Sequence, residues 1–192
     1  MTFTETADHV YSVVAREIRR ITGGSEPTRR AALAKLRRGA GKPPGSIPYI
    51  WEMTIGALSD DILYRDDRDR AEWAVHIALT LFATQKQGAD NTVSGIAGGS
   101  FGTAVATLCN PDNRESITRR FNAAVMSDTV EQLSVHARSL TGMLKGGGSD
   151  FDYPRFAKDL YYWQFDPEKT RLNWGRDYWR NNSNKQEDST DE

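Results

Sequence analysis

Apolar side chains recur along most of this chain at the three- and four-residue intervals of an amphipathic helix. The segment ADHVYSVVAREIRRI is the first example, and it carries Val10, Val13, Val14, Ile18 and Ile21 at helical spacing. Most of its charged side chains fall on other faces. The pattern predicts a helix that ends at the two glycines that follow it.

A second helix is predicted from about residue 26 to residue 38. Ser25 can cap its N-terminus, Pro27 suits its first turn, and Gly39 ends it. Its apolar residues share one arc of a helical wheel, and its basic residues spread over the opposite arc. These basic residues are Arg30, Lys35, Arg37 and Arg38. The basic side of this helix therefore faces solvent or a ligand.

The stretch GAGKPPGSIP interrupts the helical pattern. Glycine and proline dominate it, and a residue that precedes proline avoids the helical region. We expect a stiff loop there that carries Lys42. Helical patterns resume with one helix opened by Pro48 and another that begins near Asp67.

The clearest break in composition is GADNTVSGIAGGSFG, residues 88–102, which has five glycines and almost no charge. It predicts a flexible linker, and further helical patterns follow it. Strand alternation bounded by hairpin turns is not found. The chain is therefore predicted to be all-α, with two small helical bundles joined by a Gly-rich linker. The predicted parts are an N-terminal bundle (1–87), the linker (88–102), a C-terminal bundle (103–180) and a disordered acidic tail (181–192).

The formal charge of the 192 residues is −1, but the two signs are segregated. Residues 16–42 contain nine basic side chains and two acids, a local balance of +7. Residues 52–72 reverse this, with seven acids and three arginines. Further arginines and lysines follow on separate predicted helices: Arg114, Arg119, Arg120, Arg138, Lys145, Arg155 and Lys158. Such a distribution suits a protein that presents one face to a polyanion and another face to basic or neutral partners.

The composition also restricts where the protein acts. No window approaches the length of uncharged apolar sequence that spans a bilayer, and the first residues lack the features of a secretory signal. We therefore expect a cytoplasmic protein. Cys109 is the single cysteine, so a disulfide framework is excluded, and a small buried apolar role is favoured for it.

No catalytic motif stands out. His9, His76 and His136 are far apart and form no compact metal-ligand pattern. GAGKPP lacks the first glycine and the final Ser or Thr of a phosphate loop, and GGSFG lacks the spacing of a dinucleotide fingerprint. The acids of DDILYRDDRDRAE alternate with arginines, which indicates a salt-bridged surface or a protein-docking face. We expect no catalytic residue, no metal site and no cofactor.

The aromatic residues near the C-terminus have two interpretations. They could stack on unpaired bases, as in proteins that bind single strands. Core packing is the favoured interpretation, because aromatic side chains at helical spacing usually fill bundle interiors. The residues concerned are Tyr161, Tyr162, Trp163, Trp174, Tyr178 and Trp179.

Several motifs occur together in a characteristic order: LAKLRRGAGKPPG, IPYIW, ITRRFNAAV, HARSL and DYPRFAKDLYYWQFDPEKTRLNWGRDYW. With these motifs the chain resembles the CasB family, the small subunit of the type I-E CRISPR surveillance complex Cascade. The resemblance covers about residues 10 to 180. It implies an all-helical protein without catalytic activity, present as two copies along the inner face of a crRNA-guided complex. It also implies a basic surface that holds DNA open after the guide RNA has paired with the target strand.

The resemblance and the charge pattern select the same candidate binding residues. The N-terminal basic motif supplies Arg30, Lys35, Arg37, Arg38 and Lys42, the RRF motif supplies Arg119 and Arg120, and the H-x-R pattern supplies Arg138. The implied partners are the other Cascade subunits, a second copy of this chain, the crRNA, and the target DNA with its displaced strand. The alternative is a structural adaptor whose charged faces dock other protein subunits without touching nucleic acid. Phosphate binding requires that these side chains gather on one surface and are not neutralised by carboxylates.

Overall fold

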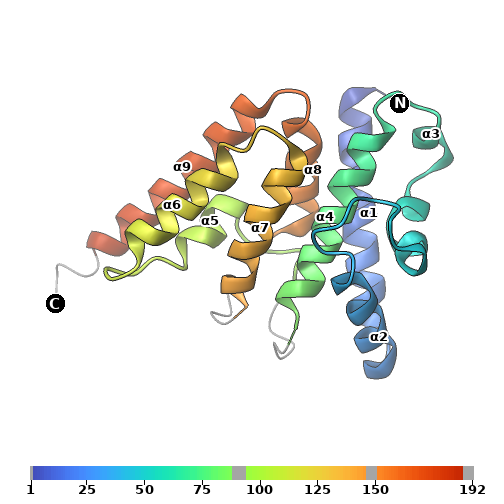
Figure 1. The fold of residues 1–192 in the computed structure, drawn as a ribbon, viewed down its shortest axis with the longest axis horizontal. Helices are drawn as coiled ribbons and strands as arrows, with labels where there is room; N and C mark the ends of the chain where they lie inside the picture. Colours follow the sequence, from blue (N-terminus) through green and yellow to red (C-terminus); the bar gives the residue numbers. More distant parts are fainter. Residues whose placement is uncertain (1, 88–93, 146–150, 188–192) are drawn as a thin grey trace.

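The computed structural model describes residues 2–87, 94–145 and 151–187, with side chains up to residue 182. The all-α prediction is confirmed, since helices make up the regular structure of these residues apart from one isolated bridge between Gly99 and Phe151 (Figure 1). The α-helices are α1 (Phe3–Gly23), α2 (Glu26–Arg37), α3 (Asp60–Leu63), α4 (Arg68–Gln85), α5 (Phe101–Ala106), α6 (Arg114–Val125), α7 (Val130–Leu144), α8 (Tyr153–Trp163) and α9 (Pro167–Glu187). Two 3₁₀ helices, η1 (Pro48–Met53) and η2 (Ile55–Ala57), precede α3.

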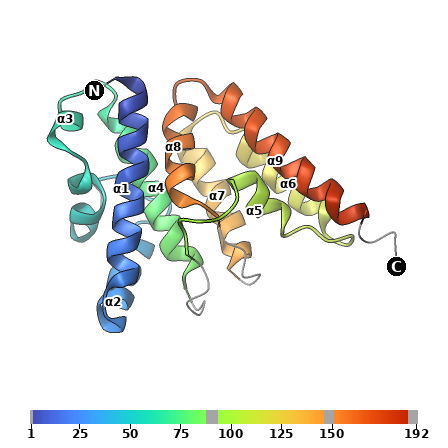
Figure 2. The same ribbon diagram turned by 180° about the vertical axis from the view of Figure 1, so that it is seen from behind.

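Helix α4 lies at the centre of the fold. Residues 74–83 are all buried, because apolar side chains occur on every side of this helix. Helices α1, α2, α7 and α8 pack on it. Figures 1 and 2 show these helices from opposite sides, with α4 between them. Segments from both halves of the sequence therefore share this helix.

A second group of contacts is rich in aromatic side chains and joins α5, α8 and α9. A Cβ atom added at Gly102 would lie 2.1 Å from the Trp174 carbonyl oxygen, so α5 and α9 approach too closely for any side chain there. The rings of Phe101 and Trp174 are 5.1 Å apart between centroids. Cys109 is buried, with its Sγ atom 3.3 Å from the Tyr178 hydroxyl, as expected for a small core residue.

Core packing is confirmed for four of the six aromatic residues near the C-terminus. Tyr161, Trp163, Trp174 and Tyr178 are buried. Tyr162 is half-buried, and 53% of Trp179 is exposed. The four buried rings therefore stabilise the fold and are not available to bases.

The described part of the predicted linker, residues 94–102, is packed. The Gly95 carbonyl accepts a hydrogen bond from the Tyr153 amide, and the Gly99 carbonyl accepts one from the Asp152 amide, each at 3.1 Å. Phe101 is buried and already belongs to α5, so the predicted boundary at residue 102 falls inside a helix. Residues 88–93 lie outside the described residues. The buried residues form one continuous cluster, and the division into two bundles stays a prediction.

Two predicted segments differ from the structure. The tail was expected to be disordered from residue 181, but α9 continues to Glu187, and 99% of Asn182 is inaccessible to solvent. The helix expected after Pro48 is split into η1 and η2. Thr54 separates the two, with φ −114° and ψ −95°, and its hydroxyl donates to the Ile50 carbonyl at 2.9 Å. Such a side-chain bond competes with the helical ladder.

Within the described ranges, no helix has the length and apolar character needed to cross a membrane.

Candidate nucleic-acid interface

The segment that links α2 to η1, residues 38–47, is called here the basic loop. Gly39 lies so close to the core that an added Cβ atom would be 2.7 Å from Ile50 Cδ1. Gly41 and Gly45 have φ values of +80° and +77°, which only glycine adopts without strain. The Trp51 indole N–H donates to the Gly45 carbonyl at 2.8 Å. These contacts give the loop a defined shape, as its glycines and prolines predicted.

His76 of α4 fixes the start of the basic loop. Its Nε2 atom lies 3.1 Å from the Gly39 carbonyl oxygen, which can only accept, so Nε2 carries the hydrogen. Its Nδ1 atom is buried and has no hydrogen-bond partner in the described part of the chain. Burial lowers the pKa of His76, because desolvation disfavours the charged imidazolium, although hydrogen bonding to the Gly39 and Lys42 backbone acts the other way. The neutral ring therefore holds the loop.

Arg138 of α7 reaches the basic loop from the other half of the sequence. A Cβ atom added at Gly41 would lie 2.8 Å from Arg138 Nη1, so the guanidinium group rests on the loop backbone next to Lys42. Both α2 and α7 pack on α4, which explains how residues so distant in sequence meet (Figure 1). The fold thus brings the H-x-R motif to the N-terminal basic motif.

The two arginines of the RRF motif lie on α6, which packs on α7. Arg120 Nη1 contacts Ser139 Oγ of α7 at 3.5 Å. An open hollow of about 290 Å³ lies between these helices, lined by Arg119, Arg120, Ala123, His136 and Ser139. Arg119 and Arg120 therefore border a hollow that is also lined by α7, the helix that carries Arg138.

The predicted binding side chains differ in whether a carboxylate neutralises them. Arg30 pairs with Glu26, one turn earlier on α2, at 2.5 Å. No carboxylate among the described residues lies within 4 Å of the other seven cationic groups. These seven are Lys35, Arg37, Arg38, Lys42, Arg119, Arg120 and Arg138. Arg37 is half-buried and the other six are exposed.

These seven side chains, called here the unpaired basic set, come from the end of α2, the basic loop, α6 and α7. Arg38, Lys42 and Arg138 belong to the basic loop or touch it. Arg119 and Arg120 lie on α6, one helix further along, and no hydrogen bond among the described residues joins them to the loop. Lys35 and Arg37 lie in the last turns of α2, directly before the loop.

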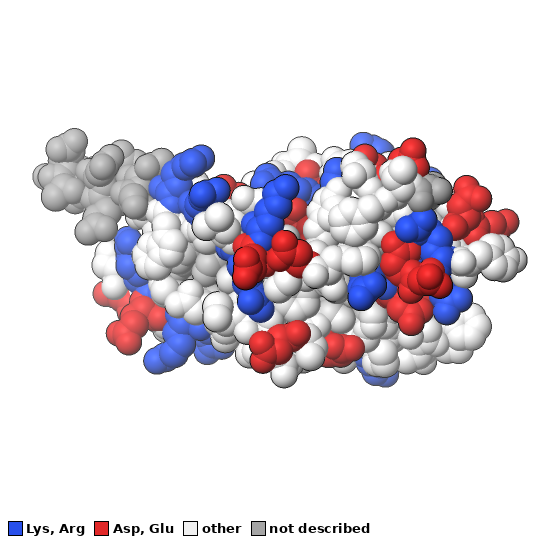
Figure 3. Space-filling model, turned by 90° about the horizontal axis from the view of Figure 1, so that it is seen from above, with Lys and Arg blue, Asp and Glu red and all other residues white. Residues whose placement is uncertain are grey.

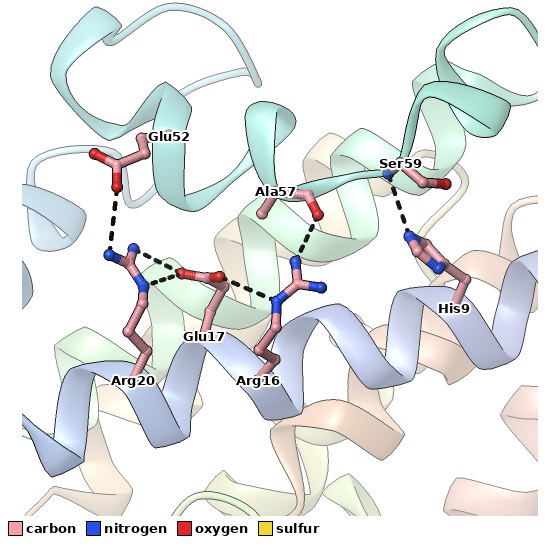
Figure 4. A network of polar contacts seen from close by, with 7 residues as sticks. All are labelled: His9, Arg16, Glu17, Arg20, Glu52, Ala57 and Ser59. Carbon is pink, nitrogen blue, oxygen red and sulfur yellow. Dashed lines mark hydrogen bonds and ion pairs between the residues drawn. The ribbon is translucent and has the colours of Figure 1, made fainter.

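Two arginines of α1 that add to the basic surplus of residues 16–42, Arg16 and Arg20, have a structural role instead and are called here the α1 arginines. Glu17 is buried, and its carboxylate lies 2.7 Å from Arg20 Nη2 and 3.5 Å from Arg16 Nε. Arg16 also donates to the Ala57 carbonyl at 2.7 Å, and Arg20 pairs with Glu52 at 3.4 Å (Figure 4). These arginines tie η1 and η2 to α1.

The acidic segment of residues 52–72 is salt-bridged. Asp67 accepts from Arg65 Nε at 2.7 Å and from the Tyr161 hydroxyl at 2.6 Å. The bond from Arg65, helped by the bond from Tyr161, lowers the pKa of Asp67 to about 2 although burial acts the other way. Acidic and basic side chains mingle on the face seen in Figure 3. In the part of the chain that the structure describes, no group of three or more His, Cys, Asp or Glu residues could hold a metal ion.

Three residues at the candidate interface were not singled out from the sequence. Tyr49 lies beside Arg38, with the guanidinium carbon 5.9 Å from the ring centroid, and 47% of the tyrosine is exposed. The IPYIW motif directly after the basic loop was its only signal. The loop-holding roles of His76 and Gly41 have no local signal, because their contacts span 37 residues and 97 residues along the chain.

Comparison with known proteins gives a family and a set of similar structures. The family model for CRISPR-associated protein Cse2 matches residues 32–179, which is more than half of the chain. CasB from Thermobifida fusca is 28% identical with a TM-score of 0.73, over 93% of this chain and 98% of that chain. No curated protein matches.

Two structures from Thermus thermophilus share the fold at 21% identity. One is named CasB, with a TM-score of 0.66, and the other is named a CRISPR-associated protein of the Cse2 family, with a TM-score of 0.65. Each alignment covers 88% of this chain and 97% of the other. The resemblance indicated by the sequence motifs is confirmed, and this chain belongs to the CRISPR-associated Cse2 (CasB) family.

Proposed function

We propose that this protein is a non-catalytic subunit of a type I-E Cascade complex that binds nucleic-acid backbone and stabilises the R-loop. Its partners there are the other subunits, a second copy of the chain, the crRNA, and the target DNA with its displaced strand, all in the cytoplasm. The observation that supports this proposal is the unpaired basic set, whose seven members have no carboxylate within 4 Å in the described ranges.

A modest number of backbone contacts is sufficient for this role. Exchange of a DNA duplex for an RNA–DNA heteroduplex is nearly balanced in free energy, so protein contacts to backbone can tip it. Five of the seven members are arginines, whose planar guanidinium groups bind phosphate oxygens in pairs. Phosphate contacts carry no sequence information directly, so binding should be insensitive to base sequence.

The test is the stability of the R-loop in the reconstituted complex, measured over a range of salt concentrations. Five phosphate contacts to single-stranded DNA give a log–log salt slope of about −3.5, and loss of two contacts reduces its magnitude by about 1.4. The variant Arg37→Ala/Arg38→Ala should show that reduction together with a weaker R-loop. Unchanged R-loop stability and an unchanged slope would refute this role for the pair.

The matched control is Arg16→Ala/Arg20→Ala, which removes the same formal charge from the ion-paired cluster on α1. It should leave the salt slope unchanged, provided that the measurement is made where the variant is folded. Equal slopes for the two double variants would mean that net charge, and not the unpaired basic set, controls binding.

The adaptor function also has a specific observation in its favour. Tyr64 is 90% exposed and lies within the acidic segment, between Asp61 and Asp66 in sequence. An exposed aromatic side chain among acids suits contact with a basic protein surface. A Tyr64→Ala variant that assembles poorly but, once assembled, binds DNA normally would assign docking to this segment.

A further inference from the structure

An aromatic ring is exposed beside the basic loop, next to an unpaired guanidinium group. Tyr49 is 47% exposed, and the Arg38 guanidinium carbon lies 5.9 Å from the centroid of its ring. Arg38 is itself exposed and has no carboxylate within 4 Å among the described residues. The ring and the cation therefore form one accessible pair at the edge of the loop.

The local fold fixes the backbone that carries this ring. Tyr49 belongs to the 3₁₀ helix η1, where successive side chains are rotated by about 120°. Ile50 is 1% exposed and anchors η1 in the core, so both of its neighbours are turned outward. Trp51 is one of them, and its indole N–H is bound to the Gly45 carbonyl at 2.8 Å. Tyr49 is the other, and its hydroxyl makes no such bond to the loop in the described part of the chain.

The nearest acid in sequence does not neutralise the pair. Glu52 lies on the same 3₁₀ helix, but its carboxylate is directed to Arg20 of α1, at 3.4 Å (Figure 4). Within the same basic loop, Lys42 and Arg138 add positive charge at Gly41. The surroundings of Tyr49 thus attract a polyanion.

We propose that Tyr49 and Arg38 form a stacking platform for an unpaired base of a single-stranded nucleic acid. The inference rests on the proposed backbone-binding function and names its substrate class. The tyrosine ring stacks on the base, and Arg38 binds the adjoining phosphate, with Lys42 and Arg138 on phosphates along the strand. Bases of a duplex are stacked on one another, so a duplex leaves this platform unused.

The test compares two labelled strands with equal numbers of phosphates, a short thymidine oligonucleotide and an abasic strand of the same length. Binding of the full-length protein is followed by fluorescence anisotropy at low salt. Stacking contributes about 1–3 kcal/mol per base, so Tyr49→Ala should lower affinity for the thymidine strand by about 5-fold to about 160-fold. Affinity for the abasic strand should not change, and Tyr49→Phe should bind both strands like the unmodified protein.

The control variant is Tyr64→Ala, which removes a still more exposed tyrosine from the acidic segment and should leave both affinities unchanged. Equal affinity of the unmodified protein for the two strands overturns the platform but leaves backbone binding intact. An equal loss for both strands in Tyr49→Ala, or a defect in complex assembly alone, also overturns it. No binding to either strand overturns the platform and the proposed function together.

Discussion

Arg16 and Arg20 of α1 resemble the arginines around the basic loop in their basic sequence context, but their surroundings in the fold are opposite. Arg16 and Arg20 converge on the buried carboxylate of Glu17. Arg38 and Arg138 lie against a tyrosine ring and a glycine backbone, and no carboxylate in the described ranges is within 4 Å of them. The comparison teaches that a run of positive charge acquires its role from the acids that the fold delivers to it.

The two sets contribute to different free energies. The α1 arginines satisfy a buried charge, so their removal changes the stability of the free chain. Clustered unpaired cations repel one another, so their removal should cost the free chain little and should instead weaken its attraction for a polyanion.

The largest effect on stability is expected for Arg16→Ala/Arg20→Ala, which leaves Glu17 buried and unpaired. Both arginines are about half exposed, so water replaces part of what they provide. We expect the free energy of unfolding to fall by about 2 kcal/mol, against less than about 0.5 kcal/mol for Arg38→Ala/Arg138→Ala. Urea denaturation of both double variants measures the difference.

A third substitution sharpens this result. Adding Glu17→Gln to the Arg16→Ala/Arg20→Ala variant removes the uncompensated charge and should restore part of the lost stability. If the two double variants lose equal stability, or if Glu17→Gln makes the first one worse, the assignment of a structural role to the α1 arginines is wrong.

A smaller effect, with a pH dependence, is expected for His76→Gln. An amide can still donate to the Gly39 carbonyl but fills less space, so stability should fall by about 1–2 kcal/mol at neutral pH. Because folding lowers the pKa of His76, its contribution is present above its unfolded value of 6.5 and is lost as the pH falls below that value. The variant should therefore lose less stability on acidification than the unmodified protein does. Urea denaturation across this range is the measurement.

Asp159 also contributes to the pH dependence of stability, in both His76→Gln and the unmodified protein. The quantity to compare is therefore the difference in stability between these two proteins at each pH. Burial raises the pKa of Asp159 from 3.8 to about 6, although the Trp174 indole N–H donates to its carboxylate at 2.8 Å. The folded chain therefore favours protonated Asp159, and this contribution is lost as the pH rises from 3.8 through about 6. Its sign is opposite to that of His76. Equal pH dependence in His76→Gln and the unmodified protein would contradict the prediction.

A matched pair of glycines tests the contact between the two halves of the sequence. Gly41 and Gly45 have φ values of +80° and +77°, so alanine at either position should cost about 1 kcal/mol of stability. Only at Gly41 does the added methyl group meet Arg138, because nothing lies within 4 Å of a Cβ atom at Gly45. Gly41→Ala should weaken binding of single-stranded DNA, and Gly45→Ala should not. Equal affinities would show that the position of Arg138 does not matter for binding.

Much of the fold was predictable because its signals are local. Periodic apolar residues located α1 and α4 within a few residues, and Pro27 near the start and Gly39 after the end also located α2. What could not be predicted depends on contacts distant in sequence. The polar composition of residues 181–187 suggested disorder, but α9 continues there, with Asn182 buried.

In the candidate site, too, local features could be predicted from the sequence and contacts distant in sequence could not. The sequence identified the basic residues, and even the Glu26–Arg30 pair has the four-residue spacing of a helical ion pair. Which of the remaining cations lack a carboxylate depends on the fold. Arg138 meets Gly41 only because α2 and α7 both pack on α4.

The smallest effect on stability and on the salt slope is expected for Arg30→Ala. This variant tests most directly whether pairing with a carboxylate keeps a cation from binding DNA. Arg30 and Glu26 are 78% and 58% exposed, so their pair contributes only about 0.3 kcal/mol to stability. A phosphate must compete with Glu26 for Arg30, whereas Lys35 on the same helix has no acid within 4 Å in the described residues. Loss of Lys35 should reduce the magnitude of the salt slope by about 0.7, and loss of Arg30 by clearly less. Glu26→Gln should free Arg30 and strengthen binding. If Arg30→Ala and Lys35→Ala reduce the slope equally, pairing with a carboxylate does not decide which cations bind DNA.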